Sequence, residues 1–443
     1  MIAIVVSRAD AASERIGQQL LNIADWNARE DSTYVDAEGG GTYYRLDADG
    51  RTFELRTFDE WHVELEDTAE PFADPDLLVF ASRHSGETGP LLTAHFTGNF
   101  GSAEFGGHDR ELAEAAPVAH KRLLERFREH APEGYDVGTE CTHHGPTTLA
   151  VPSLFAELGS GEAQWSDDAG ARAVARSVLD LGSAELHEGR RLVAFGGGHY
   201  APRPERIVRE TPWAVGHVGA DWCLEAMGAP DPDVIERTFE RSDADLATVD
   251  GDYPTLESTI EELGHRVVSE TWVREVGGTS LDLVERLESE LTPIDSGLRL
   301  GEGAREQVDE YAVDPFPTEL IETARAVDTD AVREAVETHA LAFETEEGGA
   351  RVDGRAAFVP GERESLVEAL AGVLEREYEV RREPEAIVVR ERAFDPEKAA
   401  TLGVPEGPAF GRLASGDSVE VDGRTIEPEA VHTERVRRLS RSA

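Results

Sequence analysis

Residues 192–200 read LVAFGGGHY, four apolar residues that run into three glycines, a histidine and a tyrosine. An apolar run bounded by glycine predicts a buried strand that ends in a tight turn. Outward from this stretch, similar patterns predict strands at 2–6 and 77–80, and helices at 11–24, 111–130 and 169–181. Strands that alternate with helices in this way indicate an α/β fold.

The character of the chain changes beyond about residue 277. Amphipathic helices rich in Glu and Arg are predicted at 281–291, 330–343 and 365–378, with short strands such as 386–389 between and after them. We therefore expect one domain over residues 1–277, which holds the histidine motifs described below. A C-terminal α+β extension is expected over residues 278–443, with a role that the sequence does not reveal.

The charge balance is strongly acidic. The chain has 90 acidic residues against 43 basic ones, a net charge of −47, and its only lysines are Lys121 and Lys398. An acidic excess spread evenly along a chain is typical of a protein in concentrated salt, where a Debye length of about 3 Å screens the repulsion. We expect the chain to need molar salt to fold, and repulsion between the chain and nucleic acid is expected only at low salt. The alternative is an acidic protein that binds cationic partners.

Other classes of protein are excluded by the composition. The apolar runs are far shorter than the roughly 18–20 residues that a membrane span needs. The N-terminus has neither a basic region nor a long apolar region, so no signal peptide is expected. Two cysteines cannot form a disulfide framework. We expect a cytoplasmic protein without membrane contact.

Six of the 14 histidines lie in five short motifs in the first half of the chain. The motifs are SRHS (82–85), TAH (93–95), CTHHGPT (141–147), GGGHY (196–200) and GH (216–217). At least three follow a predicted strand, and turns at the carboxyl edge of an open α/β sheet collect into one crevice. Imidazole acts as a general acid or base near neutral pH, or binds a transition metal. The motifs therefore predict a hydrolytic centre at that edge, with or without zinc.

Several residues in these motifs allow more than one interpretation. His84 and His95 suit either a metal site or a hydrogen bond within a loop. Cys141 suits either a zinc site or a small buried position in a strand. In an extended strand, Cys141 and His143 would share one face while Glu140 would lie on the other.

The three glycines at 196–198 lack the lysine of a phosphate-binding P-loop. Their backbone N–H groups could instead stabilise an oxyanion or contact a nucleic-acid terminus. Tyr200 and Trp213 could stack on an adenine base, although an aromatic residue near a strand end more often belongs to the core. Trp61 and Trp165 are expected in the core.

Taken together, the motifs resemble a known family. The segments ASRHS (81–85), LTAH with TGN (92–99), THHGPT (142–147), VPS with ELGS (151–160) and GGGHYAP (196–202) carry the resemblance. In order and approximate spacing they are similar to the archaeal-type D-aminoacyl-tRNA deacylases, also called D-tyrosyl-tRNA deacylases, over about residues 1–277. With the acidic composition, the resemblance implies a haloarchaeal form that carries a C-terminal extension.

The resemblance implies a fold, a reaction and a metal. The fold is a three-layer α/β/α arrangement with a mixed sheet, of the phosphorylase/peptidyl-tRNA-hydrolase-like kind. The reaction is hydrolysis of the ester that links a D-amino acid to the 3′ end of tRNA, by a monomer with no obligate protein partner. The implied metal is zinc.

The histidine motifs and the resemblance together suggest roles for individual residues, in which the histidines either hold zinc or position water directly. The candidate catalytic residues are His143, His144 and His199. The candidate metal ligands are His84, His95, His143, His144 and His199. The candidate substrate-binding residues are Arg83, Gly196, Gly197, Gly198 and Tyr200.

Two features depart from the family pattern. Family members have a lysine shortly after the counterpart of Gly216-His217, whereas residues 219–221 here are Gly, Ala and Asp. A basic contact to tRNA is then lost or supplied by arginine. The segment 278–443 lies outside the family core. Two other functions stay open: hydrolysis of an amide, as in a peptidyl-tRNA hydrolase or a metallo-peptidase, and tRNA binding without chemistry.

Overall fold

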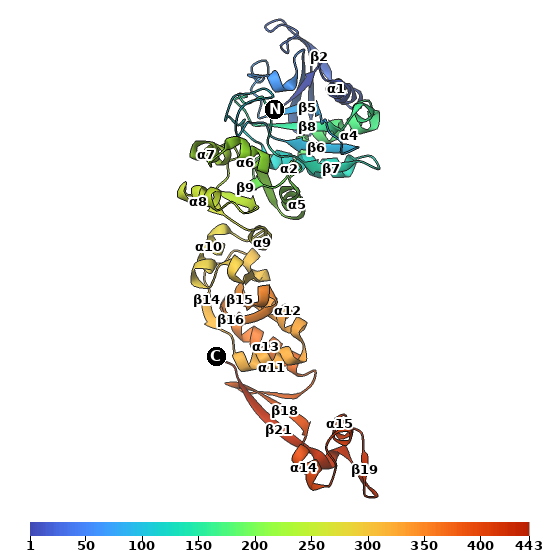
Figure 1. Cartoon of the computed structure of the whole chain (residues 1–443), viewed down its shortest axis with the longest axis vertical. Coiled ribbons are helices and arrows are strands. Elements are labelled where there is room, and N and C mark those ends of the chain that lie inside the picture. Colours follow the sequence, from blue (N-terminus) through green and yellow to red (C-terminus); the bar gives the residue numbers. More distant parts are fainter. Residues whose placement is uncertain (443) are drawn as a thin grey trace. The chain divides into compact units, whose positions relative to one another are not determined.

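The computed structural model describes residues 1–442 and consists of two compact units, residues 1–277 and a second unit that begins at Gly278. Figure 1 shows the chain coloured from its N-terminus in blue to its C-terminus in red. Each unit has its own sheets and its own buried clusters of apolar side chains.

An eight-stranded mixed sheet forms the framework of the first unit, with the strand order β2-β3-β4-β1-β5-β8-β6-β7. Its strands β5, β8, β6 and β7 are labelled one after another in Figure 1. Strands β4, β1, β5 and β8 are parallel, whereas β6 runs antiparallel to β8. The strands are β1 (Ile2–Ser7), β2 (Asn27–Asp31), β3 (Gly41–Ala48), β4 (Arg51–Phe58), β5 (Leu77–Arg83), β6 (Leu91–His95), β7 (Asp136–Thr139) and β8 (Ser153–Gly159). Every residue of β1 is buried, as expected for a central strand covered on both faces.

Helices pack on this sheet. They are α1 (Ala11–Ile23), α2 (Pro117–His130), α3 (Glu162–Trp165) and α4 (Asp168–Asp180), with short 3-10 turns at η1 (His62–Glu64) and η2 (Leu181–Ser183). Asp10 caps α1, because its carboxylate accepts hydrogen bonds from the N–H groups of Ala12 and Ser13. Ile16 and Leu20, one helical turn apart, are buried where α1 contacts β5 and α4.

Long connections cover the sheet face that carries Phe80 of β5 and Phe155 of β8. The two rings stack with centroids 4.6 Å apart. Leu65, Phe72 and Ala113, from connections before β5 and before α2, belong to the same buried cluster. Irregular connections leave room for polar side chains over this face, and the candidate site lies there.

A second, smaller sheet of the first unit contains the LVAF stretch in β9. Its strand order is β10-β9-β11-β12, and all its pairs are parallel. Helix α2 contacts β6 and β7 of the large sheet and β9 and β10 of this one. The elements are β9 (Arg190–Gly196), α5 (Pro202–Glu210), β10 (Trp213–Gly219), α6 (Asp221–Met227), α7 (Pro232–Glu240), β11 (Leu246–Asp250), α8 (Pro254–Glu262), β12 (Arg266–Val267) and α9 (Glu270–Glu275).

The second unit has an α+β organisation. A four-stranded antiparallel sheet, β13-β15-β16-β14, and a three-stranded one, β17-β18-β21, share a buried cluster with α11, α12 and α13. Its helices are α10 (Leu281–Glu290), α11 (Thr318–Val327), α12 (Thr329–His339), α13 (Glu362–Leu374), α14 (Pro396–Thr401) and α15 (Pro408–Ala414), with turns η3 (Ile294–Ser296), η4 (Glu302–Arg305), η5 (Glu347–Gly349) and η6 (Pro428–Val431). Its strands are β13 (Leu298–Leu300), β14 (Ala312–Pro315), β15 (Ala342–Glu346), β16 (Arg351–Phe358), β17 (Glu379–Arg382), β18 (Ala386–Phe394), β19 (Val419–Val421), β20 (Arg424–Ile426) and β21 (His432–Ser440).

The predicted α/β fold with a mixed sheet and an α+β C-terminal segment is confirmed, but three predicted helices run well past the observed ends, and one of them, predicted at 365–378, spans Glu362–Leu374. The helix predicted at 111–130 begins at Pro117, because Leu112 and Ala115 form bridges to neighbouring backbone instead. The helix predicted at 330–343 ends at His339, and Phe343 belongs to β15. Within residues 1–442, no helix has the length and apolar character needed to cross a bilayer.

Candidate functional site

A cavity of about 770 Å³ opens over the face of β5 and β8, and all five histidines proposed as metal ligands gather in or beside it. By register, Ser82 of β5 lies beside Glu157 of β8, and His95 of β6 lies beside Phe155 of β8. The prediction that the histidines meet at the carboxyl edge of a sheet was therefore wrong. Because β6 runs antiparallel to β8, its carboxyl end does not reach that edge, and the cluster forms over the sheet face.

Three histidines converge on one side of the cavity. His95 ends β6, and His143 and His144 follow β7. Their Nδ1 atoms lie 3.0, 2.8 and 2.6 Å from backbone carbonyl oxygens. A carbonyl only accepts, so each Nδ1 donates and each Nε2 keeps its lone pair. Ligand nitrogens of the three rings lie within 4.8 Å of one another.

These three rings are neutral at pH 7. Burial lowers the pKa of His95, and burial together with repulsion from the neighbouring rings lowers the pKa of His143 and of His144. The Nε2 atom of His95 is buried without a hydrogen-bond partner among the described residues. Such an orphaned acceptor is costly unless something binds it. Three converging neutral imidazoles, each oriented by a backbone carbonyl, are a donor set that suits zinc.

His144 has an unusual backbone conformation. Its φ is +45°, in the left-handed region that residues other than glycine rarely adopt. This conformation lets the ring of His144 lie edge-on to His143 and His95, with centroids 4.4 and 4.9 Å away. Strained backbone of this kind is concentrated at functional sites.

A charged network occupies the other side of the cavity. Glu140 accepts a 2.7 Å hydrogen bond from Nε2 of His199, and its Oε1 lies 3.1 Å from Nδ1 of His84. Although Glu140 is buried, these two histidines hold the pKa of its carboxyl well below its usual range. Hydrogen bonds to Cys141 and Glu140 raise the pKa of His199 to about 10. The contact with Glu140 also raises the pKa of His84, against the effect of burial.

A second buried carboxyl, Glu157, behaves in the opposite way. Its Oε1 lies 3.5 Å from Nε2 of His95, and its Oε2 lies 3.7 Å from Nδ1 of His84. Burial and the negative charge of Glu140 raise the pKa of Glu157 well above its usual range. The surroundings therefore favour the ionised form of one carboxyl and the protonated form of the other, a division found where a site needs both an acid and a base.

Cys141 remains a thiol. Its Sγ lies 3.4 Å from Nδ1 of His199, but the contact with Cys223 and burial raise the pKa of Cys141 to about 12. The sulfur of Cys141 and the carboxylate of Glu140 both contact the ring of His199, and both contacts raise its pKa. The expectation that Glu140 and Cys141 lie on opposite faces was wrong, because β7 ends at Thr139 and both side chains reach the same ring.

Arg83 and Tyr200 lie at the mouth of the cavity. The guanidinium of Arg83 lies over the rings of Trp61 and Trp165, 4.8 and 4.9 Å from their centroids. The hydroxyl of Tyr200 lies 3.2 Å from Nε2 of His84. Trp61 is 45% exposed and does not belong to the core, contrary to expectation. Trp213 is 1% exposed, so it cannot stack on a base.

The three glycines at 196–198 lie beside the cavity but do not line it. Gly196 has φ +83°, and a Cβ there would lie 2.1 Å from the carbonyl oxygen of Asp250. Close packing of β9 against β11 therefore explains this glycine. The carbonyl of Gly197 accepts a 2.9 Å hydrogen bond from the N–H of Asp221. Stabilisation of an oxyanion by these backbone amides stays a prediction.

His217 is separate from the cluster although its motif was grouped with the others. It is fully buried in β10, with Nε2 2.8 Å from the carbonyl oxygen of Ala113 and Nδ1 2.9 Å from the hydroxyl of Thr142. Burial lowers its pKa to about 4. His217 therefore serves packing beneath the connection that carries His143 and His144.

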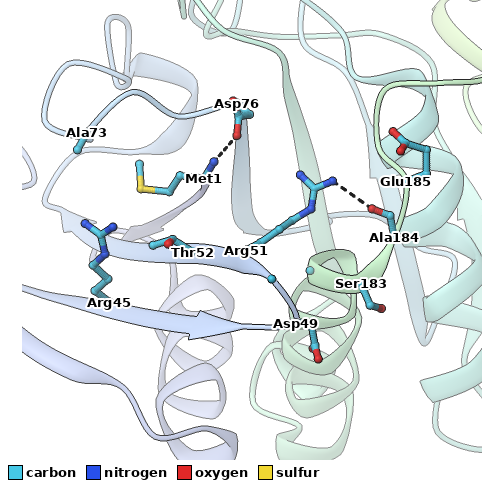
Figure 2. Close-up of a pocket in the computed structure, with 12 residues that line it drawn as sticks. Met1, Arg45, Asp49, Arg51, Thr52, Ala73, Asp76, Ser183, Ala184 and Glu185 are labelled. Carbon is cyan, nitrogen blue, oxygen red and sulfur yellow. Dashed lines mark hydrogen bonds and ion pairs between the residues drawn. The ribbon is translucent and has the colours of Figure 1, made fainter.

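Another cavity of the first unit, of about 790 Å³, contains none of the predicted site residues. Figure 2 shows its lining, where the amino group of Met1 pairs with Asp76. Arg51 donates a 3.2 Å hydrogen bond to the carbonyl of Ala184. No histidine or cysteine lines this cavity, so it lacks the chemistry of the first.

Comparison with known proteins identifies the family. Residues 71–268 match the family model described as D-aminoacyl-tRNA deacylase. A D-aminoacyl-tRNA deacylase of Halorubrum lacusprofundi is 55% identical over 99% of this chain and 96% of its own length. The D-aminoacyl-tRNA deacylase of Natronomonas pharaonis is 53% identical over 99% of this chain and 100% of its own length. That of Methanococcoides burtonii is 32% identical over 97% of this chain and 94% of its own length.

A solved structure is similar in fold to part of the chain. The crystal structure of a conserved protein of unknown function, AF0625, is 28% identical with a TM-score of 0.56. It covers 62% of this chain and 96% of its own. The relatives named above, in contrast, align along nearly the whole chain, so they share its C-terminal segment. The chain belongs to the D-aminoacyl-tRNA deacylase family.

Proposed function

We propose that this chain hydrolyses the ester bond of D-aminoacyl-tRNA and releases the free D-amino acid and tRNA. The observation that carries the proposal is the cavity in which three neutral imidazoles face a charged His84–Glu140–His199 network. Ester hydrolysis needs a group that accepts a proton from water and a group that gives one to the leaving oxygen. The two halves of the cavity offer these two functions, and the relatives carry the name of this activity.

The proposed reaction assigns one role to each half. Water attacks the ester carbonyl carbon, and a neutral imidazole among His143 and His144 accepts its proton. As the bond to the ribose oxygen breaks, charged His199 gives that oxygen a proton from Nδ1. Its present acceptor, the Sγ of Cys141, is a weak one that substrate can replace. Glu140 keeps its hydrogen bond to Nε2 and holds the ring in place.

Zinc fits the neutral half of the site. The Nε2 atoms of His95, His143 and His144 would hold it, in place of the role of His143 or His144 as proton acceptor, and the orphaned Nε2 of His95 supports this assignment. When bound, zinc supplies a Lewis acid for the ester carbonyl. The backbone carbonyl of Phe96, which accepts from Nδ1, would then orient His95 from outside the ligand set.

The same proposal includes the conditions under which the protein acts. We expect a monomer in the cytoplasm, with tRNA as its partner, no obligate protein partner and no membrane contact. With a net charge of −47, the chain should fold and approach tRNA in molar salt, where repulsion is screened. Full stability in dilute buffer would contradict this part of the proposal.

Matched substrates test the activity. In molar KCl, the protein should release tyrosine rapidly from D-tyrosyl-tRNA. Release of tyrosine from L-tyrosyl-tRNA should be no faster than the spontaneous hydrolysis measured without protein. Peptidyl-tRNA, whose ester carries a blocked amino group, should stay intact. Survival of the D-aminoacyl ester together with cleavage of the peptidyl ester would favour a peptidyl-tRNA hydrolase, and cleavage of a peptide amide would favour a metallo-peptidase. Tight binding of tRNA with no product would favour a binding protein.

A further inference from the structure

Exposed aromatic side chains gather at one place in the first unit. The chain has 16 Phe, 8 Tyr and 6 Trp residues, and most are at least partly buried. Among the described residues the exposed ones are Phe105, Trp222, Trp61 and Tyr200, with 70%, 46%, 45% and 40% of their surface accessible. The first three line the histidine cavity, and Tyr200 is joined to it through His84. We name these four side chains the aromatic rim.

Four separate segments build the aromatic rim. Trp61 precedes the turn η1, Phe105 lies in the connection between β6 and α2, Tyr200 follows β9, and Trp222 lies in the first turn of α6. The backbone carbonyl of Phe105 accepts a 2.9 Å hydrogen bond from Gly145, and the indole N–H of Trp61 donates a 3.0 Å bond to the carbonyl of Ala9. The frame is thus fixed while the rings face solvent.

Folding does not explain this arrangement. A ring left in water forgoes the stabilisation that burial would give. Single exposed apolar residues are common, but several around one opening mark a surface that recognises something. Because the opening leads to the histidines, the recognised group is a part of the substrate.

We propose that the aromatic rim stacks the unpaired nucleotides at the 3′ end of tRNA. This inference rests on the proposed function, because the ester is carried by the terminal ribose. When that ester reaches the histidines, the last bases of the strand must cross the rim. Unpaired RNA bases stack on aromatic side chains whatever their sequence, since every base has a π-face.

The charges around the opening favour stacking over phosphate contacts. Arg83 is the one Lys or Arg residue that lines the cavity among the described residues, and Asp10 and Glu104 line it too. Salt that screens repulsion between tRNA and a chain of net charge −47 also weakens attraction between arginine and phosphate. Stacking does not depend on net charge. Arg83, held between Trp61 and Trp165, extends the stacking surface because guanidinium planes also stack on bases.

Binding of uncharged tRNA tests this inference without any hydrolysis. The full-length protein, in molar KCl, is titrated with intact tRNA and with the same tRNA lacking its last three nucleotides. Intact tRNA should bind at least about tenfold more tightly, because stacking of each base contributes a factor of this order. Phe105→Ala and Trp222→Ala should each weaken binding of intact tRNA about tenfold and leave binding of the truncated tRNA unchanged.

Two further variants control the experiment. Trp222→Phe keeps a ring and should restore most of the affinity that Trp222→Ala loses. Val35→Ala removes an apolar side chain that is 59% exposed but does not line the cavity, and it should bind like wild type. Equal binding of intact and truncated tRNA by the wild type would overturn the proposal, as would alanine variants that bind intact tRNA normally.

Kinetics separate a failure of this inference from a failure of the proposed function. If the alanine variants hydrolyse D-tyrosyl-tRNA with wild-type KM, the rim proposal is wrong and the activity stands. If the alanine variants lose activity on D-tyrosyl-tRNA but keep activity on D-alanyl-tRNA, the aromatic rim binds the amino acid side chain, and the proposal is again wrong. If the wild type binds the 3′ end through the rim but hydrolyses neither ester, the rim proposal stands and the activity is wrong.

Discussion

The two sides of the cavity hold their histidines in different ways. On one side, the Nδ1 atoms of His95, His143 and His144 donate hydrogen bonds to backbone carbonyls. On the other side, His84 and His199 contact the carboxylate of Glu140. Burial acts on both groups, yet the pKa falls for the first three and rises for the other two. A carbonyl fixes the tautomer without adding charge, whereas a carboxylate stabilises imidazolium.

The partner of a buried histidine therefore decides what the ring can do. A neutral ring with a free Nε2 binds a metal or accepts a proton. A ring held by an ionised carboxylate keeps its proton and can give it away. Variants that remove one group at a time should therefore affect the two halves differently.

The largest effect is expected from His144→Ala. It removes one of the three converging imidazoles, so turnover of D-tyrosyl-tRNA should fall by about a thousandfold or more. The fold should persist, which the thermal unfolding midpoint would show. His130→Ala is a matched control, because His130 pairs with Asp180 at the surface and should be replaceable without loss of rate. Turnover near that of wild type in His144→Ala would refute its role.

Glu140→Gln should have a smaller effect and a distinctive pH dependence. The change removes the carboxylate that keeps His199 charged, so we expect kcat to fall by about a hundredfold. In wild type, the pKa of about 10 keeps His199 protonated, and the rate should hold steady from pH 6 to 9. In the variant the pKa falls toward 6.5, so the rate should decline as pH rises through neutrality. Profiles of the same shape for both proteins would contradict the assignment.

Cys141→Ser should have the smallest effect, with kcat within about fivefold of wild type. A protonated thiol is not a nucleophile, so its loss should cost little. The serine hydroxyl can also accept a hydrogen bond from His199. Steady-state rates with D-tyrosyl-tRNA would measure it. A loss of two orders of magnitude, or an acyl group trapped on the thiol, would instead make Cys141 a nucleophile.

The sequence predicted the histidines better than it predicted their partners. His84, His95, His143, His144 and His199 stand out because histidine is scarce and these lie in short, distinctive motifs. Glu140 and Glu157 were missed, because 90 acidic residues give no single carboxyl any prominence.

A signal for Glu157 was nonetheless present. It lies within SLFAELG, a run otherwise free of charged residues, and a charge within a buried strand requires a partner. Glu140 had a weaker signal, its place directly before the CTHHGPT motif.

The limits of the fold prediction have a similar cause. Local periodicity located strands such as β1, β5 and β9, because their apolar runs are buried wherever they lie. It gave neither the antiparallel direction of β6 nor the division into two sheets, which depend on pairings between distant segments. The position of the site over a sheet face follows from those pairings, so it too was beyond the sequence.

The metal content of the purified chain tests the central claim most directly, because only the neutral half of the cavity should hold zinc. Wild type and His84→Ala, purified in molar KCl and analysed by mass spectrometry, should each carry about one zinc per chain. His143→Ala should carry none, and a chelator should abolish turnover by the wild type. A wild-type chain free of metal that hydrolyses D-tyrosyl-tRNA at full rate would contradict the division of the site into these two halves.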